Sequence, residues 1–309
     1  MNFNRNLALL TVLLGVAIGH AAEGEAPQRV TIRGYNTDAM EPFISKDGRY
    51  LLFNNSNDPR VDTNLQFATQ IDDVTFQYGG SIKGANTAAV DAVPSMDSDG
   101  LLYFVSTRDY AQTLATVYRG RFDKGVLSGV EELAGLSQKK PGRLNFDAEI
   151  AADGNTLFAV DGKFSGKLFP DTADIFIAVR DANGFHRLPD SDVLMKNINT
   201  SALEYAPAVS ANLLDLYFTR AARHGHRPPV ILHASRTRVD EPFGPPQPVP
   251  SITGFVEAAT LSRDGCSLYF HKKDGDRYSI YRVDTGACVA RTARAGSYIK
   301  NESPVPGFR

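Results

Sequence analysis

Seven acidic residues occupy a recurrent place in the sequence, because each lies 9–15 residues before one of five regularly spaced phenylalanines. They are Asp38, Glu41, Asp91, Asp147, Glu149, Glu204 and Glu257. If one structural unit repeats around an axis, these side chains converge, and a ring of carboxylates favours a cation, an amine or a basic peptide. The alternative is that these acids have a purely structural role, since acids at such positions accept hydrogen bonds from backbone amides of a neighbouring unit.

Basic side chains follow the phenylalanines and are expected on the same rim as the acids. Arg108 and Arg220 are the two that we include with the seven acids as candidate ligand-binding residues. Mixed charge on one rim suits a polar small molecule, a peptide or a protein. His224 and His226 are separated by one glycine, and we predict no metal site and no cofactor, with a structural cation such as calcium at the channel as the one possibility left open.

Self-similarity along the chain explains this spacing. Five segments share one pattern, an apolar run, a tight turn and a second apolar run that ends near Phe; they cover residues 40–56, 91–108, 146–162, 204–220 and 257–273. The phenylalanines are Phe53, Phe104, Phe158, Phe218 and Phe270, with spacings of 51, 54, 60 and 52 residues. Four of the turns contain Asp-Gly, a strong hairpin signal, and Asn212-Leu213 replaces it in the fourth segment. The pattern predicts repeated β-hairpins.

Each repeat has room for four strands, since a third alternating run and a weaker fourth one follow each phenylalanine. The third strands are expected at residues 65–70, 115–121, 173–179, 229–235 and 278–283. Four strands at a period near 54 residues are typical of a β-propeller blade, and isolated blades cannot bury both faces. We therefore predict an all-β, five-bladed β-propeller with four-stranded antiparallel blades that start near residues 40, 91, 146, 204 and 257. Residues 29–34 are expected to complete the last blade. An open β-sandwich would not explain five spaced copies.

The units resemble the TolB-like, WD40-like repeat of exported bacterial propeller proteins. Residues 91–108 (DAVPSMDSDGLLYFVSTR), 173–180 and 198–220 carry the resemblance, which extends over roughly residues 30–290. It implies a propeller fold and leaves function open, because one fold hosts many functions. The leading hypothesis is an exported module that binds a protein, a peptide or a small polar ligand, and an enzyme is the less favoured one.

A five-bladed glycoside hydrolase of the arabinanase and xylosidase type is the alternative hypothesis. Its blade starts are similar to those at Glu41, Asp147 and Glu204, and such enzymes place three carboxylates in the channel. The similarity implies Glu41 or Asp38 as general base, Asp147 as the acid that tunes pKa, and Glu204 as general acid. Two features depart from that pattern: Glu41-Pro42 stands where Asp-Pro is usual, and the chain has no tryptophan to stack on a sugar.

Composition and the N-terminus bear on location. With 33 basic and 35 acidic residues the chain has no global field for nucleic acid, and nucleic-acid binding is not expected. Residues 1–21 read as a signal peptide, with Arg5, an apolar run over residues 7–18 and Ala21 at the cleavage site. We therefore expect residues 22–309 to form a single five-bladed propeller domain without a membrane segment. We expect this domain to be periplasmic or secreted. Because export exposes thiols to oxidation, Cys266 and Cys288 are predicted to form a disulfide.

Overall fold

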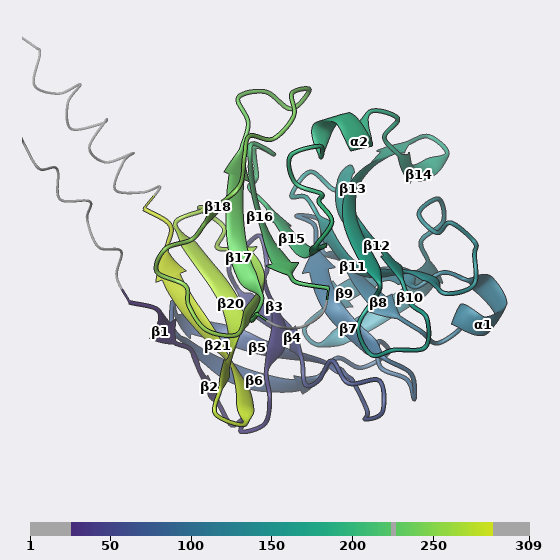
Figure 1. Ribbon diagram of the computed structural model, residues 1–309. Coiled ribbons are helices and arrows are strands. Elements are labelled where there is room, and N and C mark those ends of the chain that lie inside the picture. The colour runs from purple at the N-terminus through teal and green to yellow at the C-terminus, as the bar shows by residue number, and fades with distance from the viewer. Residues whose placement is uncertain (1–25, 224–226, 287–309) are drawn as a thin grey trace, which may run out of the picture.

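The protein is described by a computed structural model over residues 26–223 and 227–286, and its strands form five antiparallel units arranged around a central axis (Figure 1). The first unit has strands β3 (Met40–Ile44), β4 (Tyr50–Asn54), β5 (Leu65–Asp72) and β6 (Thr75–Ser81). The second has β7 (Asp91–Met96), β8 (Leu101–Ser106), β9 (Val117–Asp123) and β10 (Val126–Glu132). The third has β11 (Arg143–Ile150), β12 (Thr156–Lys163), β13 (Thr172–Asp181) and β14 (Gly184–Arg187).

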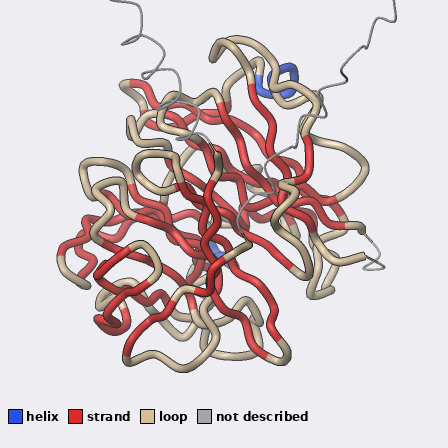
Figure 2. The backbone as a smooth tube through the Cα atoms, turned by 90° about the vertical axis from the view of Figure 1, so that its left-hand side faces the viewer, coloured by secondary structure: helices blue, strands red, loops and turns tan. Residues whose placement is uncertain are grey.

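The fourth unit has β15 (Leu203–Val209), β16 (Asp215–Ala221), β17 (Val230–Ser235) and the short β18 (Gln247–Pro248). The fifth has β19 (Val256–Leu261), β20 (Ser267–Asp274), β21 (Arg277–Asp284) and β1 (Gln28–Arg29), while β2 (Thr31–Arg33) joins the first unit. Helix is limited in the described residues to α1 (Tyr110–Thr113) and α2 (Ser191–Leu194), and strands dominate the backbone trace (Figure 2). No helix in this part of the chain is long and apolar enough to cross a membrane. The predicted all-β propeller fold, with four-stranded antiparallel blades, is confirmed.

The ring closes at its N-terminal strand, but differently from the prediction. β1 pairs antiparallel with β21, so that Arg29 lies opposite Tyr281 in the last blade. β2 instead pairs parallel with β6 of the first blade, with Ile32 opposite Phe76. The segment expected as one strand of the last blade therefore divides at Val30, whose N–H donates to the Ile280 carbonyl, and it ties two blades together.

The hydrophobic core is distributed between blades. All five repeat phenylalanines are completely buried. Five core clusters are present in the described residues, and each joins two neighbouring blades; one packs Phe43 and Leu52 of the first blade against Phe104 of the second. Since each face of a blade is covered by the next blade, no blade has a core of its own.

The hairpin turns follow the sequence signal. The glycines of the Asp-Gly turns have φ values of 66–83°, and Leu213 takes φ 62° in the fourth blade without glycine. The Asn212 side chain accepts a hydrogen bond from the Leu214 N–H at 3.1 Å, which holds this turn in shape. These turns lie at the end of the blades opposite the starts of the inner strands.

Candidate functional site

The five inner strands β3, β7, β11, β15 and β19 surround a central channel, and each carries a β-bulge at the same place. In four of them the bulged residue has a positive φ of 49–54°: Glu41, Val93, Ala206 and Ala258. Such a conformation is strained for residues other than glycine. The bulged residues line the channel, whose volume there is only about 20 Å³, close to the space of one water molecule. A ligand can therefore lie over the channel but not within this narrow part.

Polar atoms of adjacent blades hold three of these bulges. The Glu41 N–H donates to His271 Nδ1, the Val93 N–H to Asn54 Oδ1 and the Ala258 N–H to Thr219 Oγ1, each at 3.1 Å. His271, Asn54 and Thr219 directly follow a repeat phenylalanine. The position therefore supplies an acceptor for the next blade, and only His271 among these three is titratable.

In the third blade the acceptor for the bulged residue of the next blade is an acidic side chain. Ala159 follows its phenylalanine and has no polar side chain, and the Ala206 N–H instead donates to Asp147 Oδ2 at 2.9 Å. Asp147 lies on β11 and lines the channel. This carboxylate therefore has a structural contact as well as its place in the channel.

Five side chains gather where the inner strands begin, and we call them the channel-mouth cluster: Glu41, Asp147, Tyr205, Glu257 and His271. His271 is completely buried, with Nδ1 4.0 Å from Glu41 Oε1 and Nε2 3.3 Å from Glu257 Oε2. The Tyr205 hydroxyl donates to Glu257 Oε1 in a short contact. Because Nδ1 accepts from the Glu41 backbone, the proton of the neutral ring lies on Nε2 and points to Glu257. The cluster joins blades 1, 3, 4 and 5.

Burial perturbs the ionisation of these groups. Burial raises the pKa of Glu41, helped by the charge of Glu257 and opposed by His271. Burial together with the charge of Glu41 raises the pKa of Asp147 well above its ordinary range. Burial lowers the pKa of His271, but its hydrogen bond to Glu257 and the charge of Glu41 outweigh this effect and raise it. Two carboxyl groups that disfavour each other's charge are suited to hold one proton between them.

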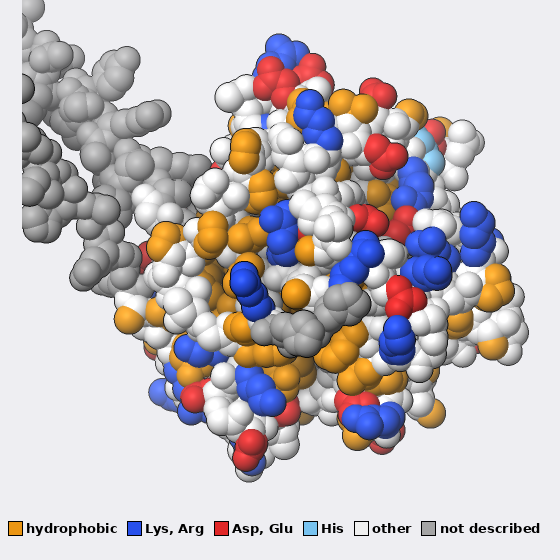
Figure 3. Space-filling model, in the orientation of Figure 1, with side chains coloured by type: hydrophobic (Ala, Val, Ile, Leu, Met, Phe, Trp, Pro, Cys, Tyr) orange, Lys and Arg blue, Asp and Glu red, His pale blue; other side chains and the backbone are white. Residues whose placement is uncertain are grey.

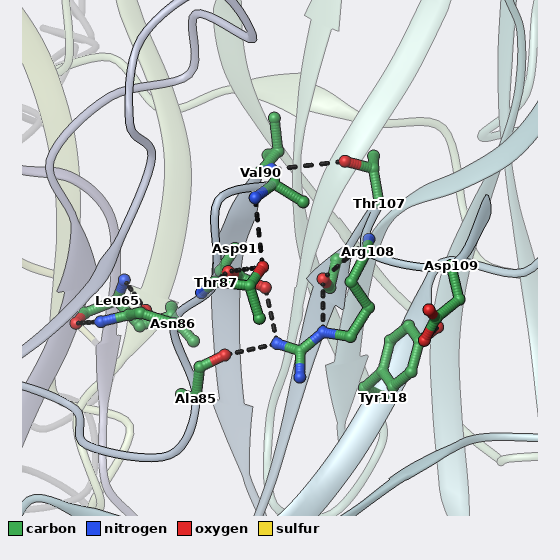
Figure 4. A network of polar contacts seen from close by, with 12 residues as sticks. Leu65, Ala85, Asn86, Thr87, Val90, Asp91, Thr107, Arg108, Asp109 and Tyr118 are labelled. Atoms are coloured by element: carbon green, nitrogen blue, oxygen red, sulfur yellow. Dashed lines mark hydrogen bonds and ion pairs between the residues drawn. The ribbon is translucent and has the colours of Figure 1, made fainter. Parts of the chain in front are cut away.

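Two other predicted residues, Asp91 and Arg108, lie in a network between blades (Figure 4). Arg108 Nη2 contacts Asp91 Oδ1 at 2.7 Å and also donates to the Ala85 carbonyl. Asp91 Oδ2 accepts from the N–H and hydroxyl of Thr87 at 2.5 and 2.8 Å. Asn86 bonds the Leu65 backbone of the first blade through both amide atoms. This arrangement fixes the linker between blades 1 and 2.

Glu204 and Arg220 repeat that network in the fourth blade. Arg220 Nε donates to Glu204 Oε1 at 2.7 Å, and Arg220 Nη2 donates to the Ile198 carbonyl at 2.8 Å. Glu204 is completely buried and accepts from the N–H and hydroxyl of Thr200. Asn199 bonds the Ile175 backbone as Asn86 bonds Leu65. The two pairs share one linker-fixing geometry.

The structure corrects one carboxylate of the glycosidase alternative. Successive residues of a strand face opposite sides, so Glu204 and its neighbour Tyr205 on β15 diverge. Tyr205 reaches Glu257 in the channel-mouth cluster, whereas Glu204 is held by Arg220 away from the channel lining. Glu204 therefore does not converge with Glu41 and Asp147, which line the channel, whereas Glu257 lies close enough to Glu41 for the two charges to interact.

The remaining predicted residues lie elsewhere. Asp38 Oδ1 accepts from the Tyr278 N–H of the last blade at 3.1 Å. Glu149 lines the channel nearer the hairpin turns, and Lys46 Nζ lies 3.4 Å from its Oε1. Whether any of the nine predicted residues binds a ligand stays a prediction.

Other predictions concern residues that are not described. Cys266 lies before β20, but Cys288, His224, His226 and residues 1–21 fall outside the described residues. Within residues 26–223 and 227–286 no group of three or more His, Cys, Asp or Glu side chains could hold a metal ion.

Sequence reasoning missed Tyr205 and His271. The available signals were their positions, since His271 directly follows a repeat phenylalanine and Tyr205 precedes an Ala-Pro bulge. It also missed Asn57, whose Nδ2 donates to Glu41 Oε1 at 2.6 Å.

Comparison with known proteins supports the fold. No family of known proteins and no curated protein matches the amino-acid sequence. Similar solved structures include an exo-β-1,3-galactanase from Phanerochaete chrysosporium, with 13% identity, 85% of this chain and 64% of that chain covered, and a TM-score of 0.55. A thermostable family-43 glycoside hydrolase has 13% identity, coverage of 91% and 99%, and a TM-score of 0.52.

A family 117 glycoside hydrolase from Zobellia galactanivorans has 12% identity, coverage of 84% and 89%, and a TM-score of 0.51. A TolB from Agrobacterium tumefaciens has 15% identity, coverage of 80% and 77%, and a TM-score of 0.47. At these identities the likeness concerns the fold alone. The chain is a β-propeller, and the comparisons support the fold expected from the repeats without supporting a TolB-like specificity.

Proposed function

We propose that the protein is a glycoside hydrolase whose reaction takes place at the channel-mouth cluster. The observation that carries the proposal is the convergence of Glu41 and Glu257 on buried His271, with Asp147 close enough to Glu41 for the two charges to interact. Burial raises the pKa of both Glu41 and Asp147. Glycoside hydrolysis needs one protonated and one ionised carboxyl group. The similar solved structures of glycoside hydrolases support a carbohydrate as substrate class.

The environment of each acid suggests its role. Asp147 has its pKa raised well above the ordinary range by burial and by the charge of Glu41, and would donate the proton to the leaving oxygen. Glu41, held by Asn57, would accept a proton from the attacking water. Glu257, which accepts from the Tyr205 hydroxyl, would take the third place that Glu204 cannot fill. The sugar would lie over the mouth because the channel itself is too narrow.

The test is release of reducing ends from β-1,3-galactan, arabinan and xylan oligosaccharides by the wild-type protein and by Glu41→Gln and Asp147→Asn. Loss of one catalytic carboxyl group should reduce kcat by at least about 10²-fold. Glu131→Gln is the control, since Glu131 lies on the outer strand β10, is exposed and pairs with Arg119, and this variant should keep its activity. Absence of turnover on all three glycans, or full activity of Asp147→Asn, would contradict the proposal.

A binding module is the second candidate function, and the internal hydrogen bonds of the cluster favour it. Each acid of the channel-mouth cluster already accepts a hydrogen bond from the protein, through Asn57, Ala206 or Tyr205. If the same oligosaccharides bind without turnover, as measured by calorimetry, this second function replaces the first.

We also propose that the protein acts outside the cytoplasm. The support is the signal-peptide pattern of residues 1–21, which lie outside the described residues. N-terminal sequencing of the protein from an expressing bacterium should begin at Ala22, and a retained Met1 in a cytoplasmic fraction would contradict this.

A further inference from the structure

A second cavity lies over the third blade, separate from the channel. Its volume is about 450 Å³, within the 300–1,000 Å³ typical of small-molecule sites. Its lining comes from the start of β11, from β12 and β13, and from α2 with the residues that follow it. The channel-mouth cluster contributes no residue to it. Acidic and basic side chains are interspersed on the face of the molecule that Figure 3 shows.

Arg187 and Asp161, which both line this cavity, form an ion pair with each other. Arg187 Nη2 lies 2.6 Å from Asp161 Oδ2, and the Arg187 guanidinium lies 3.5 Å from the centre of the Phe176 ring. Gln138 Nε2 also donates to Asp161 at 2.7 Å. The charges of Arg187 and Asp161 therefore compensate each other within the protein.

Four other charged residues of the cavity lining form no such pair in the part of the chain that the structure describes. Arg143, Lys196, Asp174 and Asp192 have no side-chain hydrogen bond or ion pair within the described residues. Partial burial and the charge of Glu204 raise the pKa of Asp174, and the charges of Arg223 and Arg143 oppose this rise only in part. The cavity thus offers two cationic and two anionic groups, and their formal sum is zero.

We propose that this cavity binds a small zwitterion, a free amino acid or a short peptide with both termini charged. The ligand carboxylate would face Arg143 and Lys196, and its ammonium group would face Asp174 and Asp192. A purely anionic or cationic ligand would satisfy one pair and be repelled by the other, and a neutral sugar would form no ion pair with any of the four groups.

The experiment compares alanyl-alanine with its N-acetylated form, its C-terminal amide and galactose by isothermal titration calorimetry. Alanyl-alanine should bind wild-type protein at least tenfold more tightly than either blocked form. Asp174→Asn should weaken alanyl-alanine binding about tenfold, and this variant should bind alanyl-alanine and its N-acetylated form equally well. Arg143→Gln should also weaken alanyl-alanine binding about tenfold, and it should bind alanyl-alanine and its C-terminal amide equally well. These paired losses identify the partner of each charge.

Two exposed residues outside the cavity give matched controls. Asp276→Asn and Arg263→Gln remove the same charges and should leave alanyl-alanine affinity within twofold. Thermal melting of each variant shows that the fold is intact. Equal binding of galactose and alanyl-alanine, absence of dipeptide binding at 10 mM, or blocked forms that bind as well as the free dipeptide would overturn the proposal. Because the cavity and the channel share no residue, failure here leaves the proposed hydrolysis untouched.

Discussion

His271 Nδ1 accepts a hydrogen bond from the Glu41 backbone N–H at 3.1 Å, across 230 residues of chain. This contact joins the last blade to the first at the point where the ring closes, and the strained bulge at Glu41 depends on it. Asn54 and Thr219 make the corresponding contacts elsewhere in the ring. Ring closure and the candidate catalytic cluster therefore share one side chain.

His271→Ala should destabilise the protein by about 2–4 kcal/mol, because it removes a buried ring and leaves the Glu41 N–H without an acceptor. His271→Asn should recover part of this loss, since asparagine makes this contact at Asn54. Urea unfolding curves give both values. Equal destabilisation by the two substitutions would show that the hydrogen bond does not hold the closure.

Asp147→Asn should raise the free energy of unfolding of the protein at neutral pH, because it removes a charge whose burial is unfavourable. Burial raises the folded-state pKa of Asp147 above its unfolded value, so the wild-type protein is most stable below the unfolded pKa and loses stability as pH rises through the folded pKa. Asparagine keeps an oxygen for the Ala206 N–H and has no such loss. The difference between variant and wild type should therefore grow from pH 4 to pH 8 in urea unfolding experiments. A constant difference across this range would contradict the prediction.

Arg220→Ala should destabilise the protein by about 3–5 kcal/mol, because it leaves the completely buried Glu204 carboxylate without its counter-charge. Combining it with Glu204→Gln should recover part of the loss, since the remaining amide carries no charge. Arg238→Ala is the control: its pair with Asp240 is exposed to solvent, and its removal should leave the stability almost unchanged. Thermal unfolding resolves the three cases, and a small effect of Arg220→Ala would mean that the linker network is dispensable.

Thiol titration of the denatured, unreduced protein should detect no free thiol if Cys266 and Cys288 are bonded. The structure adds a reason to the sequence argument, because the Thr285 N–H donates to the Cys266 carbonyl at 2.9 Å and so brings the chain close to Cys266 three residues before Cys288. The bridge would stabilise the protein by about 3 kcal/mol in the chain-entropy model. Two reactive thiols per chain would rule it out.

Local signals in the sequence were sufficient for the architecture. Asp-Gly turns, strand alternation and a phenylalanine every 51–60 residues define hairpins and their period, and a blade that cannot bury its own faces must pack against others. The third strands, β5, β9, β13, β17 and β21, accordingly lie within a few residues of their predicted positions. All five phenylalanines are buried as such packing requires.

Only the tertiary structure decided which side chains meet. Glu204 and Tyr205 are adjacent in sequence, yet one is fixed beside Arg220 and the other reaches Glu257, because strand alternation combined with the bulge sets the direction of each. The division of the N-terminal segment at Val30 and the contact of His271 with Glu41 join residues about 230–250 positions apart. Such pairings arise from ring closure, which adds contacts between blades that no local pattern in the chain encodes.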